Sequence, residues 1–243
     1  MSAPAASAHG LWWNGGDMLR TRIFDAISLL LPTGEQFVIA AVQDVLRTVD
    51  VPEPLRAESH RFIDEERSHQ RAHRLDVARL ARHAPAAALE RRIAEAVHRL
   101  DAGTLATRIA FAAAFEVLTG LLSREVLRDD GVWLAGGSAP QQRLWRWHGA
   151  EEIGHGHVAV DLMHAAGVGP WRRAGVFAAA AACLATDVIG LLAALCRHDR
   201  RAGRARLGAL LWQVAAFGVR SLPGWARIAG GALGYAVTGR TPR

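Results

Sequence analysis

The stretch LWRWHGAEEIGHGHV, residues 144–158, places two acids and three histidines among tryptophans and apolar residues. Glu152 and His155 are three residues apart, so a helix would project both side chains from one face. His148 lies four residues before Glu152 and seven before His155, which puts all three on one stripe. The stretch therefore predicts either a wet, charged helix face or one part of a metal site.

A second copy of this spacing lies in FIDEERSHQRAH, residues 62–73, where Glu66 and His69 are also three apart. A single Glu-x-x-His in a helix is common and usually marks solvated surface. Two copies favour a metal site, because two-metal bundles take one such pair from each of two helices and a single Glu from each of the other two. His73 lies on the same side as Glu66 and could be an extra ligand, but we interpret it as an outer or surface histidine.

Two further acids supply the single carboxylates that this pattern requires. Glu116 lies between the apolar stretches IAFAAAF and VLTGLL, where an unpaired carboxylate is costly unless it is protonated or bound to a metal. Glu35 is followed by FVIAAV, and its alternative role is that of a first-turn acid that favours the helix dipole. Together with the paired motifs, both acids are interpreted as metal ligands.

The pattern along the chain predicts an all-α fold. Strand patterns are nearly absent, and apolar residues recur at spacings of three and four. Thr33 and Gln36 resemble a capping box that would begin the first main helix. The expected helices cover residues 33–49, about 54 to 84, 104–127 and 140–166, with a shorter amphipathic piece at 89–100. Four main helices with one longer connection indicate a ferritin-like four-helix bundle with additional C-terminal apolar helices.

We divide the chain into an N-terminal segment (1–27), a two-metal bundle (28–170) and a C-terminal helical extension that packs on the bundle (171–243). Residues 175–196 contain one charge, Asp187, and five arginines follow up to Arg206. That length could span a membrane, but the acid and the many alanines make insertion marginal. We expect a peripheral membrane contact or a homodimer contact here, and a non-enzymatic membrane or metal protein is the remaining alternative.

Composition narrows the class of protein. All 29 cationic side chains are arginines, scattered along helical patterns, so no nucleic-acid partner is expected. The two cysteines, Cys183 and Cys196, share one apolar helical segment in which a disulfide between them would be awkward. The first sixteen residues lack the pattern of a secretory signal. We therefore expect a cytoplasmic protein.

The layout of residues 28–162, including the two quoted stretches, resembles the bacterial family catalogued as predicted metal-dependent hydrolases. The motif series is also similar to that of the di-iron N-oxygenases that oxidise arylamines. In those enzymes the histidine four residues before the last Glu is a third imidazole ligand, and the resemblance implies this role for His148. The ligand set is then Glu35, Glu66, His69, Glu116, His148, Glu152 and His155.

The first functional hypothesis is a non-heme di-iron oxygenase that uses O₂ to hydroxylate or N-oxygenate a small organic substrate. Carboxylates with imidazoles suit iron or manganese, and zinc also accepts them. An external reductase or ferredoxin would supply electrons. Thr119, one turn after Glu116, could donate a hydrogen bond toward O₂, although such a residue more often bonds its own backbone.

The second hypothesis is a metal-dependent hydrolase in which the metal activates a water molecule. A carboxylate outside the ligand set, Glu65 or Glu151, would then act as the general base. Glu151 and His157 point away from the stripe of His148 and are expected to lie outside the ligand set or in solvent.

Overall fold

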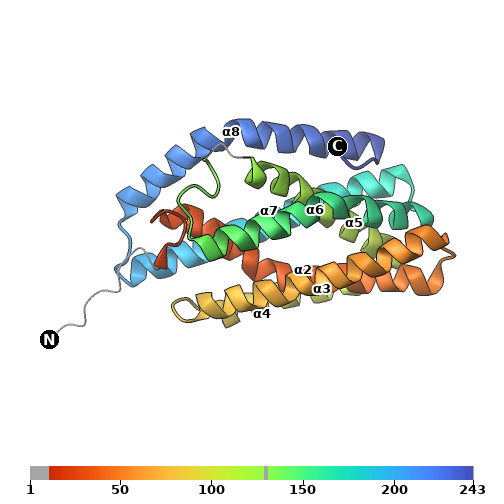
Figure 1. Cartoon of the computed structure of the whole chain (residues 1–243), viewed down its shortest axis with the longest axis horizontal. Coiled ribbons are helices and arrows are strands. Elements are labelled where there is room, and N and C mark those ends of the chain that lie inside the picture. Colours follow the sequence, from red (N-terminus) through yellow and green to blue (C-terminus); the bar gives the residue numbers. More distant parts are fainter. Residues whose placement is uncertain (1–10, 129–130, 243) are drawn as a thin grey trace.

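The computed structural model describes residues 11–128 and 131–242, and long helices make up most of both ranges (Figure 1). Within these ranges there is no β-strand, only an isolated bridge between Asn14 and Gly137. The expected all-α class is therefore confirmed. The helices are α2 (Met18–Thr48), α3 (Glu53–Ala81), α4 (Ala86–Asp101), α5 (Leu105–Leu127), α6 (Ala139–Ala165), α7 (Pro170–Arg201) and α8 (Leu207–Thr238).

Helices α2, α3, α5 and α6 form the bundle that carries the predicted ligands. α5 packs along α6 and α2 along α3, and the two pairs meet through α2 with α5 and through α3 with α6. Small residues let α5 approach α6 closely: a Cβ atom at Gly120 would lie 3.2 Å from the carbonyl oxygen of Glu152. This close packing brings Glu116, one turn earlier on α5, against the Glu152 face of α6.

The start of the first bundle helix was predicted wrongly. α2 begins at Met18 rather than at Thr33, and the side chain of Asp17 caps it by accepting a backbone N–H. Pro32 lies inside the helix, where it removes one helical hydrogen bond and normally ends or bends a helix. The capping pattern after Pro32 therefore resembled the start of a helix. In the structure the helix continues across this proline, because tertiary contacts stabilise the turns before it.

A buried ion pair is the clearest of these contacts. The guanidinium of Arg22 is completely buried and lies 2.6 Å from a carboxylate oxygen of Asp25, one turn later. It also lies 2.7 Å from Asp199 on α7, whose side chain is equally buried. α2 is therefore one continuous helix across residue 28, where we expected the N-terminal segment to end and the bundle to begin. The Arg22–Asp199 ion pair joins the first part of this helix to the C-terminal extension.

The other ligand-bearing helices lie close to their predicted positions. α3 begins with proline in its first turn. α5 begins after Thr104, whose side chain accepts the N–H of Thr107. α6 ends just before Gly167, which has a φ of +71° and so adopts the left-handed conformation that favours glycine.

The apolar helices differ in how deeply they are buried. α2, α5 and α7 are long and apolar enough to cross a membrane, judged by length and composition. The most apolar part of α2 is 72% buried within the protein, whereas that of α7 is only 17% buried. α7 packs on α2 and α5, and α8 runs along the outside of the bundle (Figure 1). The expected cytoplasmic location is therefore not confirmed.

Candidate metal centre

Side chains from four helices converge on one buried cluster inside the bundle. Each of the seven predicted ligands is at most 4% exposed. Potential ligand atoms of two groups lie within 4.8 Å of one another: Glu66, His69, Glu152 and His155 form one group, and Glu35, His69 and His148 form the other. Glu116 adjoins the first group, because its Oε2 lies 4.0 Å from Nδ1 of His155. The structure thus brings the whole predicted set together, and its role in ligation stays a prediction.

The two Glu-x-x-His pairs face each other across α3 and α6. His155 Nδ1 on α6 lies 2.6 Å from Oε1 of Glu66 on α3. In the reverse direction, His69 Nδ1 on α3 lies 3.5 Å from Oε1 of Glu152 on α6. Both imidazoles therefore turn the same nitrogen, Nδ1, toward the carboxylates of the cluster.

The fit of a metal ion to the cluster can be judged from the buried polar atoms that lack a hydrogen-bond partner. Both carboxylate oxygens of Glu35 and Glu116 are buried without a hydrogen-bond partner among the described residues, and so are Oε2 of Glu66 and Nδ1 of His69. Buried polar atoms are normally satisfied, so such a concentration of lone pairs needs an explanation. A divalent cation accepts carboxylate oxygens and imidazole nitrogens together, and these residues fit one.

Two carboxylates at the edge of the cluster orient the imidazoles. Nε2 of His69 lies 2.8 Å from Glu151, and Nε2 of His155 lies 3.0 Å from Glu65. An ionised carboxylate only accepts hydrogen bonds, so each imidazole donates from Nε2 and turns Nδ1 toward the cluster, where a metal ion would take the place of a proton on that atom. Glu65 and Glu151 are thus the outer partners that commonly hold metal-binding histidines.

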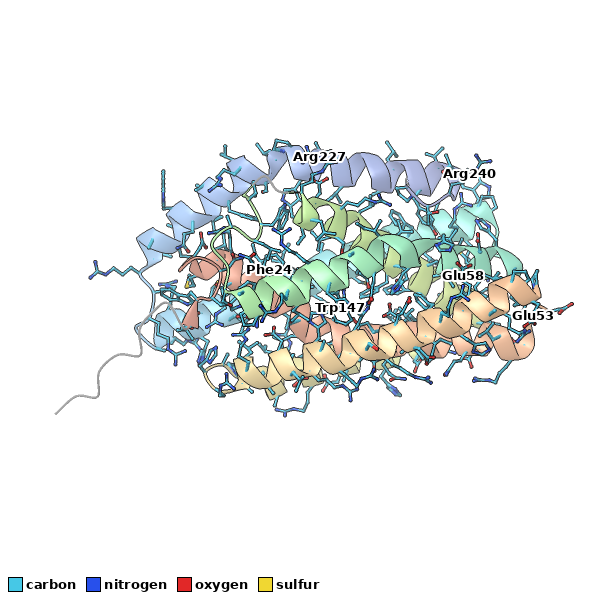
Figure 2. The ribbon with its side chains drawn as sticks, viewed as in Figure 1. Phe24, Glu53, Glu58, Trp147, Arg227 and Arg240 are labelled. Atoms are coloured by element: carbon cyan, nitrogen blue, oxygen red, sulfur yellow. The ribbon has the colours of Figure 1, made fainter. Side chains whose placement is uncertain are left out.

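Glu151 also connects the cluster to the surface. Trp147 donates its indole N–H to Glu151 at 2.9 Å, and its ring lies 5.0 Å from that of His69, centroid to centroid. Figure 2 shows Trp147 where α6 faces α3. The indole therefore helps to cover His69 on the solvent side. The expectation that Glu151 lies outside the ligand set agrees with this arrangement.

A chain of hydrogen bonds orients the third imidazole, His148. Its Nδ1 lies 3.1 Å from Nε2 of His73, whose Nδ1 lies 2.8 Å from the hydroxyl of Ser28. Ser28 donates its single proton to Asp76, so His73 must donate to Ser28 and accept from His148. The lone pair of His148 Nε2 is then directed toward Glu152, 3.4 Å away.

The interpretation of His73 as an outer histidine stays a prediction, and its hydrogen bonds to His148 and Ser28 support it. Ser28 and Asp76 were not identified from the sequence, because no motif links them to the cluster. Asp76 also accepts from Arg79 at 2.7 Å and from Gln141 at 2.6 Å, so the far end of the chain is anchored. Burial lowers the pKa of His73 and that of His148 to about 3, which keeps both imidazoles neutral.

Without a metal ion, the pKa values of two carboxyl groups and two imidazoles of the cluster are raised, which favours their protonated forms. Burial raises the pKa of Glu35 and of Glu116 well above the usual range, and neighbouring carboxylates raise both further. Burial opposes the charged form of His69, but its contacts with Glu152 and Glu66 outweigh this and raise its pKa to about 11. The same balance raises the pKa of His155 to about 12. A metal ion would replace these protons.

Thr119 faces the cluster, but its hydroxyl already has partners. Its Oγ1 lies 2.5 Å from Oε2 of Glu152 and 3.1 Å from the backbone oxygens of Phe115 and Glu116. The backbone bond is the alternative that we weighed from the sequence. The contact with Glu152 was not expected, and it makes Thr119 a residue that positions a carboxylate.

A narrow space lies between α5 and α6 next to two residues of the cluster. A space of about 20 Å³ touches Glu116 and Glu152 and is bounded by Gly120, Gly156 and Thr241. This is room for about one water molecule. A wider space of about 590 Å³ lies outside it and shares Thr241 as a boundary.

The comparisons with known proteins point to metal chemistry as well. A family model described as "Predicted metal-dependent hydrolase" matches residues 3–238, nearly the whole chain. No curated protein and no solved structure matches the chain.

Proposed function

The chain belongs to the family of predicted metal-dependent hydrolases, and we propose that it is a metalloenzyme whose two-metal centre activates O₂ to oxidise a small organic substrate. The proposed ligands are the seven residues of the buried cluster, and iron is the proposed metal. The class of reaction is hydroxylation or N-oxygenation.

The facing Glu-x-x-His pairs are the observation that carries this proposal. Ferritin-like di-iron and di-manganese proteins use such a pair from each of two helices and one Glu from each of the others. Here α3 and α6 supply the pairs, and α2 and α5 supply Glu35 and Glu116. When bound, two ferrous ions would supply electrons for the reduction of O₂, and further electrons would come from an external reductase or ferredoxin.

The chain's own residues hold and shield the metals. Glu65 and Glu151 keep the Nδ1 lone pairs of His155 and His69 free for ligation. Thr119 fixes one oxygen of Glu152. The buried surroundings exclude bulk water, which strengthens electrostatic interactions and limits side reactions.

Hydrolysis is the second candidate, and the description of the family favours it over oxidation. The same ligands could hold a metal that lowers the pKa of a bound water. The carboxylates that we considered as general bases, Glu65 and Glu151, are both engaged with imidazoles. A hydrolytic reaction would therefore depend on the metal-bound water itself or on a carboxylate of the cluster.

Metal analysis followed by anaerobic loading distinguishes the candidates. We expect about two iron ions per chain and a transient visible absorption when the ferrous protein meets O₂. The variants Glu116→Ala and His155→Ala should lose metal, whereas Glu95→Gln, on the exposed side of α4, should not. Retention of zinc with turnover of ester or amide substrates would instead support hydrolysis.

A further inference from the structure

A second, apolar cavity lies between the bundle and the helices that cover it. Its volume is about 430 Å³, within the range of small-molecule sites. α2, α4, α5 and α7 all contribute to its wall. Most of its lining side chains are apolar, and Arg99, Thr186 and Asp187 are the polar ones. The apolar side chains include Leu30, Phe37, Val97, Phe111, Phe115 and Leu184.

Two residues that line this cavity are each followed along the chain by a carboxylate of the cluster, although neither carboxylate lines the cavity itself. Gly34 and Phe115 line it, and the next residues along their helices are Glu35 and Glu116. A Cβ atom at position 34 would lie only 3.0 Å from Cζ of Phe115, so glycine lets this ring lie against α2. The cavity therefore reaches the contact between the two helices that carry the single carboxylates.

We propose that this cavity binds the organic substrate, and that the substrate is an uncharged molecule with a largely apolar body. This inference rests on the proposed function of the metal centre. The narrow space between α5 and α6 near Gly120 has room for a molecule the size of water only, whereas the apolar cavity is roughly twenty times larger. Phe37 and Phe111 meet edge to face in its wall, which suits hydrocarbon or aromatic groups.

Cys183 provides a test that needs no metal. It lies at the rim of the cavity and is exposed, whereas Cys196 is buried and burial raises the pKa of its thiol to about 11. An alkylating reagent should therefore modify Cys183 first. We expect 1-decanol to slow this modification several-fold in the metal-free protein, and glycerol to have no effect.

Filling the cavity provides the matched variant. Ala96→Phe adds a ring to the cavity wall on α4, whereas Ala94→Phe adds the same ring at an exposed position of that helix. Protection by 1-decanol should disappear in the first variant and persist in the second. If 1-decanol fails to protect Cys183 in the native protein, or protects Ala96→Phe equally, the cavity is not the site. Metal binding is measured separately, so either proposal can fail alone.

A different observation concerns the outer surface of the C-terminal helices. Of the residues of α8, only Ser221, Gly224 and Tyr235 are buried. Most of its exposed side chains are nevertheless apolar, and Trp212 is 73% exposed, whereas Arg220 and Arg227 are exposed charged residues of the same helix. On α7, Trp171 is 90% exposed. Further exposed apolar residues on α8 are Leu211, Val219, Leu222, Leu233 and Val237, spaced so that they share one side of the helix.

Charges around this surface are almost all positive. Residues 171–243 contain eleven arginines but only two acids, Asp187 and Asp199. Asp199 is buried against Arg22, and Asp187 is half-buried. Arg200, Arg201 and Arg206 are exposed at the turn between α7 and α8. An apolar stripe that is flanked by arginines and tryptophans is typical of helices that lie in a membrane interface.

We infer that the exposed side of α7 and α8 docks on an anionic lipid bilayer, with α8 lying in the interface. A symmetric dimer through this surface would place the same arginines of two copies near each other, which disfavours a second copy as the occupant. A crossing of the bilayer by α8 is disfavoured too, because Arg220 and Arg227 lie within the helix and Arg227 is paired with Glu125 of the bundle.

Vesicle flotation tests this inference on the full chain. Vesicles of phosphatidylcholine with phosphatidylglycerol should bind the protein, and vesicles of phosphatidylcholine alone should bind it at least about tenfold more weakly. The double variant Leu211→Glu, Leu222→Glu should lose about tenfold or more of the binding. Leu75→Glu, at an exposed leucine of α3, is the matched control and should bind normally.

A charge-reversal variant and a measurement of the oligomeric state complete the test. Arg200→Glu with Arg206→Glu should weaken binding to the anionic vesicles while leaving the circular dichroism spectrum unchanged, since both positions are exposed. If the native protein binds neither vesicle, or forms a dimer that Leu222→Glu dissociates without any vesicle binding, the inference is wrong.

Discussion

His73 and His148 form a hydrogen-bonded pair of imidazoles, with Nε2 of His73 3.1 Å from Nδ1 of His148. This hydrogen bond occupies Nδ1 of His148, so Nε2 is the nitrogen that faces the carboxylates. We predict that His73→Phe lowers the affinity for a divalent metal by about tenfold or more, because outer partners of metal-binding histidines contribute about that much. A competition titration with a chelating dye measures the affinity. His60→Phe, at an exposed position of the same helix, should leave it unchanged.

Metal binding should release protons. The pKa of His69 is about 11 and that of His155 about 12 in the metal-free cluster, because contacts with Glu152 and Glu66 outweigh burial. Both imidazoles therefore carry a second proton at neutral pH, which the metal must displace, and affinity should fall as the pH decreases from about 8 to about 6. Zinc titrations by calorimetry in two buffers of different ionisation enthalpy count the protons released. Identical enthalpies in the two buffers would contradict this prediction.

The attachment of α8 to the bundle should depend on acid pH. Burial opposes the charged form of Glu125, but Arg227 and Arg128 outweigh this and lower its pKa below the usual 4.5. A lowered carboxyl pKa stabilises the fold above about pH 4.5, and the contribution disappears as the pH falls through the folded-state pKa. Arg227→Gln should cost about 1 kcal/mol at neutral pH, since Arg227 is 41% exposed. Urea unfolding should show the difference from the native protein shrinking below the lowered pKa.

Loss of the buried partner of Arg22 should destabilise the whole fold. Asp199→Ala leaves the guanidinium with Asp25 as its remaining ion-pair partner among the described residues, and breaking a buried pair costs about 3 kcal/mol or more. Urea unfolding measures the loss. Asp161→Ala, at an exposed position of α6, should change the stability by less than about 0.5 kcal/mol.

The residues within each helix were predictable because helical spacing decides which side chains share a face. Glu116 could be identified from its apolar neighbours together with the paired motifs, and the structure places it at the cluster. The partner that each imidazole meets was not predictable, because that depends on how α3 and α6 are rotated and shifted against each other. Glu65 and Glu151 therefore resembled free general bases in the sequence, although each accepts a hydrogen bond from an imidazole.

The early start of α2 was missed for a different reason. A proline normally marks the end or the start of a helix, so Pro32 was interpreted as a helix boundary. In the structure the buried ion pair of Arg22 with Asp199 stabilises the helical turns before this proline. That pairing joins residues 177 positions apart, so no local pattern reveals it. Ser28 lies in the same missed turns, which is why its bond to His73 was missed too.

The opening between Gly120 and Gly156 has a consequence for the choice of metal. At about 20 Å³ it is too small for a hydrated cation, so an ion that entered on this side would need a local separation of α5 from α6. Exchange by this route would then depend on how often the two helices separate locally. We expect the bound ion to be the one that was abundant when the chain folded, rather than the one that binds most tightly at equilibrium.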